Sequence, residues 1–340
     1  MAANRTKSII TIVAIIALAL ICAYFDLAWI SAQRSYSLQE VIDTLLGKGT
    51  WSSDIIINQT NAPRVVIAVF VGMGLAIAGT AMQAVFRNPL ASPYILGLSS
   101  GASVGAAISM LFTITIIPLA IVTPVLAFIT CSLTMALVYT MARVGGTVRT
   151  ETLILSGVVV CALLSAIVSF LTFIAGDKLE GIVFWTMGSL SGATWEQIAF
   201  VAPVIVLCSI FLVTQAKPLN AMMLGDIHAM DLGVDVKKTR LVVLILTTVI
   251  VATAVSFVGV IGFVGLVIPH MLRIVLGPDN RLIMPMSMLA GSAFLVICDL
   301  ITRVIAPQYG VLPIGVVTSL IGAPVFIYLL IRRKKEVGWN

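Results

Sequence analysis

Long apolar stretches dominate this sequence and decide what the chain can fold into. The 340 residues are 60% hydrophobic and only 10% charged, whereas an ordinary soluble domain is about one quarter charged. Several stretches reach the ~20 apolar residues that cross a bilayer as a helix. A soluble protein with an unusually apolar core would lack the polar residues to cover its surface. The sequence therefore predicts an all-α integral membrane protein.

Ten segments are predicted to be transmembrane helices within a single transmembrane domain that covers residues 1–340. They are 9–30, 63–84, 94–111, 117–141, 152–175, 197–214, 241–260, 262–276, 283–304 and 312–331. The first is longer than the 7–15 residues typical of a signal-peptide core, and no clear cleavage site follows it, so we expect it to be retained. The seventh and eighth run nearly together, and the eighth is short for a full span.

The basic residues predict the orientation, because cytoplasmic loops are enriched in Lys and Arg. Ten spans with both termini in the cytoplasm place 15 of the 20 lysines and arginines inside and 5 outside. This bias favours the orientation over its inverse. The net charge of +6 therefore reflects topology, and no nucleic-acid partner is indicated.

No metal site or resident cofactor is expected. The two histidines, His228 and His270, lie far apart, and the cysteines form no CxxC or Cys/His cluster. Apolar segments hold all five cysteines, Cys22, Cys131, Cys161, Cys208 and Cys298. Such cysteines behave as small buried hydrophobic residues.

The chain carries no energy source of its own. It lacks the G-x-x-x-x-G-K-[ST] phosphate loop of an ATPase and shows no catalytic constellation, which disfavours a membrane enzyme. Ion-coupled carriers place ionisable residues in mid-membrane; here Asp26 lies near a helix end, and Asp299 stands four residues before Arg303, a pairing distance on a helix. The sequence therefore favours a membrane pore subunit that is driven by a separate ATPase. An ion-coupled secondary carrier, a different class of transporter, stays open as the alternative function.

Two polar segments are candidate contact regions. Pro63 and Arg64 open the second predicted helix at the outer face, where Arg64 either snorkels to the interface or meets an acidic partner. Residues 215–240 form the longest predicted inner loop and are rich in Met and Leu for a loop. Exposed apolar residues rimmed by polar ones indicate a protein contact, although an ordinary solvated loop stays open.

Four stretches carry a resemblance to a known family. They are MQAVFRNPLASPYILGLSSGASVGA (82–106), GFVGLVIPHMLRIVLGPDNR (262–281), LPIGVVTSLIGAPVFIYLL (312–330) and LNAMMLGDIHAMDLGV (219–234). Together they resemble the permease family of ABC importers for iron–siderophore complexes, haem and vitamin B12. The resemblance extends over essentially the whole chain.

The resemblance implies a ten-helix permease of the cytoplasmic membrane that forms a homodimer around a central translocation path. Two ATP-binding subunits would bind on the cytoplasmic side, and an extracytoplasmic substrate-binding protein would dock on the other. ATP and Mg would belong to the ATPase, so no cofactor is expected on this chain. The permease itself would not be an enzyme.

Site residues follow from the same resemblance. Arg64 and Arg303 match arginines that pair with glutamates on the binding protein, and Thr150 and Glu151 match the cytoplasmic gate. The coupling region that contacts the ATPase provides six further candidates, Leu219, Asn220, Leu224, Gly225, Leu232 and Gly233.

The chain departs from the family pattern at two of these places. Asn61 stands where the family often has a second docking arginine. Glu151 stands where a small hydroxyl residue is usual, and it would either add negative charge at the exit or pair with Arg149. A ferric chelate (siderophore or haem) ranks first as substrate, a corrinoid second, and an oxyanion such as molybdate stays open.

Overall fold

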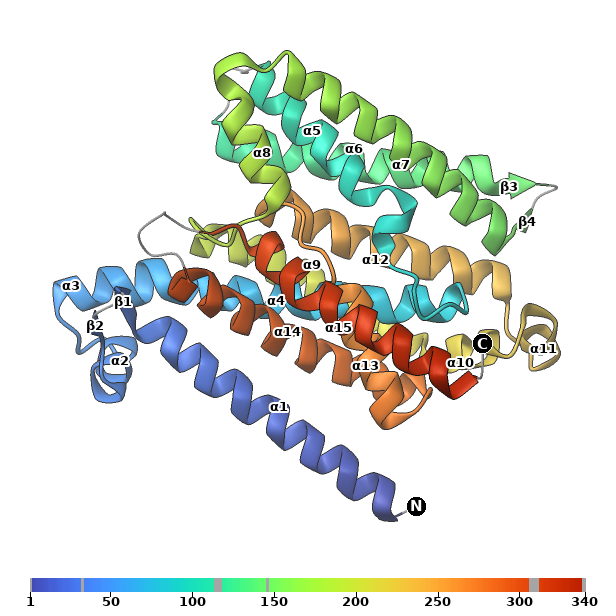
Figure 1. Cartoon of the computed structure of the whole chain (residues 1–340), viewed down its shortest axis with the longest axis horizontal. Helices are drawn as coiled ribbons and strands as arrows, with labels where there is room; N and C mark the ends of the chain where they lie inside the picture. Colours follow the sequence, from blue (N-terminus) through green and yellow to red (C-terminus); the bar gives the residue numbers. More distant parts are fainter. Residues whose placement is uncertain (1, 32–33, 113–117, 145–146, 306–311, 338–340) are drawn as a thin grey trace.

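The computed structural model describes residues 2–31, 34–112, 118–144, 147–305 and 312–337, and it is almost entirely helical (Figure 1). The first half contains α1 (Ala2–Ala28), α2 (Leu38–Leu45), α3 (Trp51–Asp54), η1 (Ile55–Asn61), α4 (Ala62–Val85), η2 (Pro93–Leu96), α5 (Leu98–Leu111), α6 (Leu119–Ala142) and α7 (Thr150–Phe173). Two antiparallel pairs of very short strands, β1 (Trp29–Ser31) with β2 (Arg34–Ser35) and β3 (Arg143–Val144) with β4 (Thr147–Val148), close turns between helices.

The second half is also helical. It contains η3 (Gly176–Lys178), α8 (Leu179–Met187), α9 (Trp195–Thr214), α10 (Ala216–Met223), α11 (Asp226–Asp231), α12 (Val236–Val258), α13 (Val264–Leu276), α14 (Asn280–Ile305) and α15 (Ile314–Val337). The all-α fold predicted from the sequence is confirmed.

Six helices in the described part of the chain are long and apolar enough to cross a membrane. One of them is the continuous run Trp51–Val85 formed by α3, η1 and α4, and the others are α6, α7, α9, α12 and α14. Four shorter apolar helices, Val13–Ala28, Leu98–Leu111, Val264–Leu276 and Ile314–Leu329, coincide with the remaining predicted segments. That all ten cross the membrane, and in which orientation, stays a prediction.

Two predicted connections are helical rather than irregular. Residues 215–240 hold α10, α11 and the start of α12. Asp235 caps α12 by accepting a hydrogen bond from the Lys238 backbone N–H, so that helix begins five residues earlier than expected. Between α7 and α9, the nine-residue α8 went unpredicted because it is too short to give an apolar span signal.

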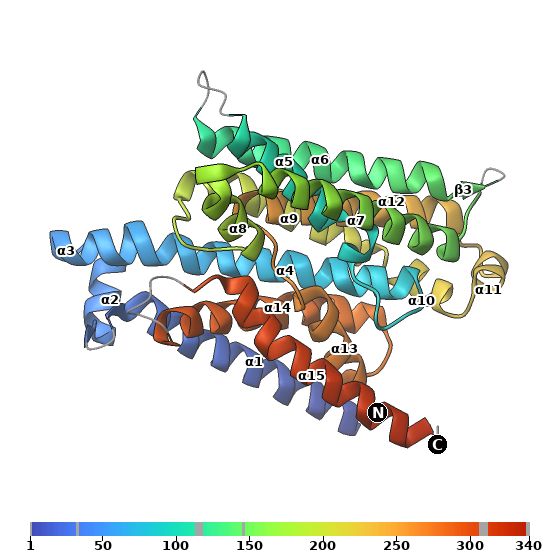
Figure 2. The same cartoon turned by 45° about the horizontal axis from the view of Figure 1, so that its top comes forward.

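Helix α4 runs through the middle of the molecule (Figures 1 and 2). It packs against α13 and α14 on one side and against α9 and α12 on the other, and 20 of its 24 residues are buried. Glycines allow the close approach: a Cβ on Gly79 would meet the Gly265 carbonyl oxygen of α13, and one on Gly72 would meet the Gly291 carbonyl of α14. Small residues permit such contact where lipid provides no hydrophobic drive for helix association.

Both chain ends lie at one end of the bundle. Helix α15 ends beside α10, and α1 begins toward the same end of the bundle, whereas α2 and α3 mark the opposite end (Figure 1). Hereafter the inner end is the one with α10 and α11, which the basic residues predict to face the cytoplasm, and the outer end is the one with α2 and α3.

We expect Gly79→Ala to destabilise the protein, because the added methyl group would overlap the Gly265 backbone rather than a flexible side chain. Overpacking of this kind costs about 1–3 kcal/mol and should lower the thermal unfolding temperature in detergent. Gly181→Ala in α8 is the control, since its nearest neighbour would be a sulfur atom 3.9 Å away. Equal stability of the two variants would contradict the assigned α4–α13 contact.

Candidate functional site

Four buried charged side chains form a cluster at the outer end of α1, α4 and α14. Arg64 of α4 donates two hydrogen bonds from Nε and Nη2 to the Asp299 carboxylate of α14, at 2.7 Å each, and a third to the Thr302 hydroxyl at 2.9 Å. Arg303 Nε lies 3.0 Å from Asp26 Oδ1 of α1. Both arginine side chains are 8% exposed and both aspartates 0%. Two arginines and two aspartates are therefore grouped in pairs inside the protein.

Asn61 completes this outer charge cluster and explains why an arginine is absent there. Its amide oxygen accepts a hydrogen bond from Arg303 Nη1 at 2.8 Å. Its amide nitrogen donates to the carbonyl oxygens of Leu27 and Trp29 at 2.9 Å each. An arginine at this position would have no acceptor for Arg303 and would add a cation to a balanced group. Asn61 thus joins the end of α1 to Arg303.

The pairing differs from the one that the sequence spacing suggested. Asp299 and Arg303 are 3.9 Å apart, whereas Arg64 makes the short contacts with Asp299. The snorkelling alternative for Arg64 is wrong, because its guanidinium group turns inward to a buried carboxylate. Docking by Arg64 and Arg303 stays a prediction, and direct contact with a partner would require both to leave their aspartates.

At the inner end, α10 and α11 present an apolar surface. Four side chains of this coupling surface, Leu224, Ile227, Met230 and Leu232, are 56–70% exposed. Leu219 and Met222 are fully buried against the core, whereas Ala221, Met223 and Val234 are partly buried against it. The helices are separated by Gly225, whose φ of +121° suits glycine. Among the predicted coupling residues, Leu219 is therefore buried, whereas Leu224 and Leu232 are exposed and stay candidates for a contact.

Asp226 holds this unit to the rest of the protein. Its carboxylate lies 2.8 Å from Arg240 Nη2 of α12 and 3.4 Å from Arg87 Nη2, which follows α4. Arg240 also donates to the Val148 carbonyl oxygen next to the start of α7. One aspartate thereby links α11 to α12 and to the segment after α4, and Arg240 extends the contact to the chain before α7.

Asn220 provides a second attachment. Its side chain donates to Asp279 Oδ1 at 2.6 Å and accepts from the Asn280 backbone N–H at 2.8 Å, so α10 is bound to the start of α14. Hydrogen bonds from the Arg281 side chain, assisted by the Arg281 backbone and Asn220, lower the pKa of Asp279 to about 2. Asn220 therefore attaches α10 to α14, and its predicted role in ATPase coupling stays a prediction.

The predicted gate residues open α7. Thr150 is its first residue, and the exposed Glu151 lies in the first turn, where a carboxylate suits the positive end of a helix. The described residues contain no Glu151–Arg149 ion pair, so that alternative is not observed. The buried hydroxyl of Thr150 has no hydrogen-bond partner among the described residues. A gating role for this pair stays a prediction.

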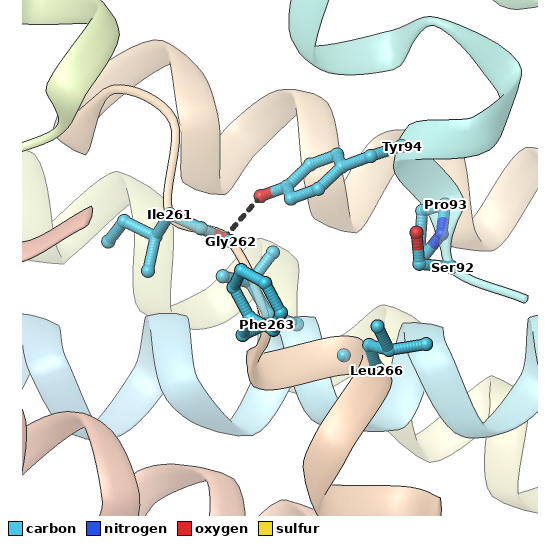
Figure 3. Close-up of a pocket in the computed structure, with 9 residues that line it drawn as sticks. Ser92, Pro93, Tyr94, Ile261, Gly262, Phe263 and Leu266 are labelled. Carbon is cyan, nitrogen blue, oxygen red and sulfur yellow. Dashed lines mark hydrogen bonds between the residues drawn. The ribbon is translucent and has the colours of Figure 1, made fainter. Parts of the chain in front are cut away.

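A cavity of about 220 Å³ lies between η2 and the segment that joins α12 to α13 (Figure 3). Tyr94 crosses it and donates a hydrogen bond to the Ile261 carbonyl oxygen at 2.8 Å. Phe263 lines the same cavity with a φ of +67°, unusual for a non-glycine residue, and its ring packs where a Cβ on Gly322 would lie. The cavity is smaller than the ~300–1,000 Å³ of a typical small-molecule site. It is therefore too small to serve as a substrate-binding chamber by itself.

Sequence reasoning missed several of these residues. Tyr94 belongs to the stretch 82–106 that carries the family resemblance, but its pattern gave no sign of a cavity. Phe263 has no distinguishing sequence pattern; it lies at the start of the eighth predicted segment, 262–276. Among the described residues, no group of three or more His, Cys, Asp or Glu could hold a metal ion.

Comparison with known proteins gives a consistent result. A family profile described as the FecCD transport family matches residues 5–332. The chain is 42% identical to the cobalamin import system permease protein BtuC of Halobacterium salinarum, over 84% of this chain and 75% of that protein. It is 39% identical to the hemin transport system permease protein HmuU of Yersinia pestis, over 81% of this chain and 82% of that protein.

A solved structure agrees as well. A metal-chelate type ABC transporter in an inward-facing conformation superposes with a TM-score of 0.84 at 31% identity, over 94% of this chain and 98% of that one. The fold is therefore that of a multi-pass membrane permease. The chain belongs to the FecCD transport family. It is the permease subunit of an ABC importer and not an enzyme, because the ATPase of such importers is a separate subunit.

We expect Asp299→Asn to be strongly destabilising, because it leaves the buried Arg64 guanidinium without its counter-charge. Breaking a buried pair by removing one partner costs about 3–5 kcal/mol. The loss should appear in thermal unfolding of the purified permease. Asp177→Asn, at an exposed aspartate, is the control. An unchanged unfolding temperature for Asp299→Asn would mean that the cluster does not stabilise the fold.

The attachment of α10 should depend on pH. The native pKa of Asp279 is about 2, below its ordinary 3.8; its stabilising contribution is therefore complete above about pH 4 and is lost as the pH falls through about 2. Protection of the α10 amides against hydrogen exchange, measured relative to the intrinsic exchange rate at each pH, should fall over this range in the wild type. Asp279→Asn should show fast exchange at every pH, and identical profiles for the two proteins would contradict the prediction.

Proposed function

We propose that this chain imports a metal chelate across the cytoplasmic membrane, driven by two ATPase subunits bound at its inner end. The observation that supports this best is the coupling surface of α10 and α11, a set of exposed apolar side chains on a unit braced by two polar attachments. Apolar residues rimmed by charges on a water-facing surface are typical of a protein contact.

The polar contacts of Asp226 and Asn220 suggest how movement of the ATPase reaches the membrane helices. A displacement of α11 acts through Asp226 on α12 and on the segment after α4. A displacement of α10 acts through Asn220 on the start of α14. Closure of the ATPase on ATP would therefore shift α4, α12 and α14 together, while Arg240 extends the movement to the chain before α7, where the predicted gate residues lie.

The translocation path is proposed to lie between two copies of this chain. The cavity at Tyr94 and Phe263 contains no charged side chain, which suits a path that must not retain a bulky chelate. An extracytoplasmic binding protein would deliver the substrate at the outer end and supply most of the selectivity. The outer charge cluster would support that docking face by fixing the ends of α1, α4 and α14.

A ferric chelate stays our first candidate substrate, and a corrinoid is the second. The relatives named for cobalamin and hemin transport are similarly close in identity, and both names denote metal chelates. Transport assays with each chelate, using the cognate binding protein, would separate these candidates from an oxyanion.

We expect Ile227→Asp to weaken assembly with the ATPase subunits and to reduce ATP-driven uptake. Placing a carboxylate in the core of an interface typically costs more than 2 kcal/mol, so co-purification of the ATPase should fall by about tenfold or more. Leu46→Asp is the matched control, because Leu46 is 66% exposed, close to the 70% of Ile227, but lies at the outer end. If both variants retained the ATPase equally, the coupling assignment would be wrong.

A further inference from the structure

An apolar groove opens between α6 and α9, and it shares no lining residue with the coupling surface or with the cavity at Tyr94. Its volume is about 500 Å³. Val125 and Phe128 of α6 form one wall, Phe200 of α9 forms the other, and Phe257 of α12 lies at the floor with its ring 5.7 Å from that of Phe200.

The groove exists because of how three helices pack. Helices α6 and α9 each contact α12 extensively, whereas they make no comparable contact with each other. A channel with α12 as its floor therefore remains between them. Pro124 lies in its wall, and a proline inside a helix bends it and removes a backbone hydrogen bond, which hinders closer packing of α6 on α9.

The bilayer is the expected medium around this groove. Ile121, Val125 and Phe200 on its rim are 50–56% exposed, and all three belong to helices that are long and apolar enough to span the membrane. From Ala120 to Ile129 the α6 wall rises about 14 Å, roughly half of the ~30 Å hydrocarbon core. The groove therefore has about the depth of one leaflet.

Apart from the buried Ser256 of α12, the polar residues of the groove gather at its mouth. Thr194, Glu196 and Gln197 line it at the start of α9, where Thr194 and Gln197 form a capping box. Glu196 is exposed and forms no ion pair within the described part of the chain. A carboxylate at the mouth of an apolar groove complements an amphiphile with an apolar tail and a cationic head.

We propose that this groove binds one acyl chain of a membrane phospholipid, with an amine head group against the Glu196 carboxylate. Opposite charge attracts the amine and disfavours an anionic head group. The proposal is independent of the transported substrate and of the ATPase, because none of the residues involved belongs to the coupling surface or the outer charge cluster.

Native mass spectrometry of the purified full-length permease tests the proposal with phosphatidylethanolamine and phosphatidylglycerol of identical acyl chains. The wild type should retain the ethanolamine lipid preferentially. Glu196→Gln should abolish this preference while leaving the protein folded, since Glu196 is exposed. Val125→Trp should fill the groove and reduce retained lipid by about tenfold.

Leu133→Trp is the control, on the exposed face of the same helix but outside the groove, and it should retain lipid like the wild type. Equal losses for Val125→Trp and Leu133→Trp would indicate ordinary surrounding lipid and would overturn the proposal. Equal retention of both lipids by the wild type would overturn the assignment of Glu196. Thermal unfolding without added lipid verifies that each variant is folded, and lipid should then raise the unfolding temperature of the wild type but not of Val125→Trp.

Discussion

The contact between α4 and α14 is the interaction on which the rest of the structure depends. Along its length, the two helices are joined by polar side-chain contacts and by one close backbone contact between glycines. Arg64 binds Asp299 at the outer end, the Ser292 hydroxyl donates to the Val69 carbonyl, Gly72 meets Gly291, and Thr80 donates to Ser287 further inward. In a bilayer, buried polar groups must find partners inside the protein, and this contact provides them.

The same contact gives the two ends of the molecule a physical connection. At the inner end, Asn220 binds α10 to Asp279 and Asn280, where α14 begins. At the outer end, α14 carries Asp299 and Arg303, which bind α4 and α1. One continuous helix of 26 residues thus joins the coupling surface to the outer charge cluster. A movement imposed on α10 acts on a helix that reaches the face where the binding protein is proposed to dock.

The sequence predicted the parts of this arrangement that depend on local pattern. The length of the apolar stretches predicted the long helices. The Met and Leu content of residues 215–240 indicated a contact region. The helices of that region were not predicted, because Gly225 and Gly233 are typical of loops. The inward direction of Arg64 could not be predicted, because its partner Asp299 lies 235 residues away. The only spacing in view paired Asp299 with Arg303, and folding gave the aspartate a closer partner. The role of Asn61 likewise depends on the carbonyl groups that end α1.

The exposed apolar side chains of α10 and α11 are proposed to form the ATPase contact and to lie on the opposite membrane face from α2. Cysteine accessibility measures this directly, with Met230→Cys and Leu46→Cys probed by a membrane-impermeant maleimide and the wild type as background. Cys at position 46 should react in intact cells, whereas Cys at position 230 should react only after permeabilisation and should be protected once the ATPase subunits are bound. Equal labelling at position 230 with and without the ATPase would contradict the account.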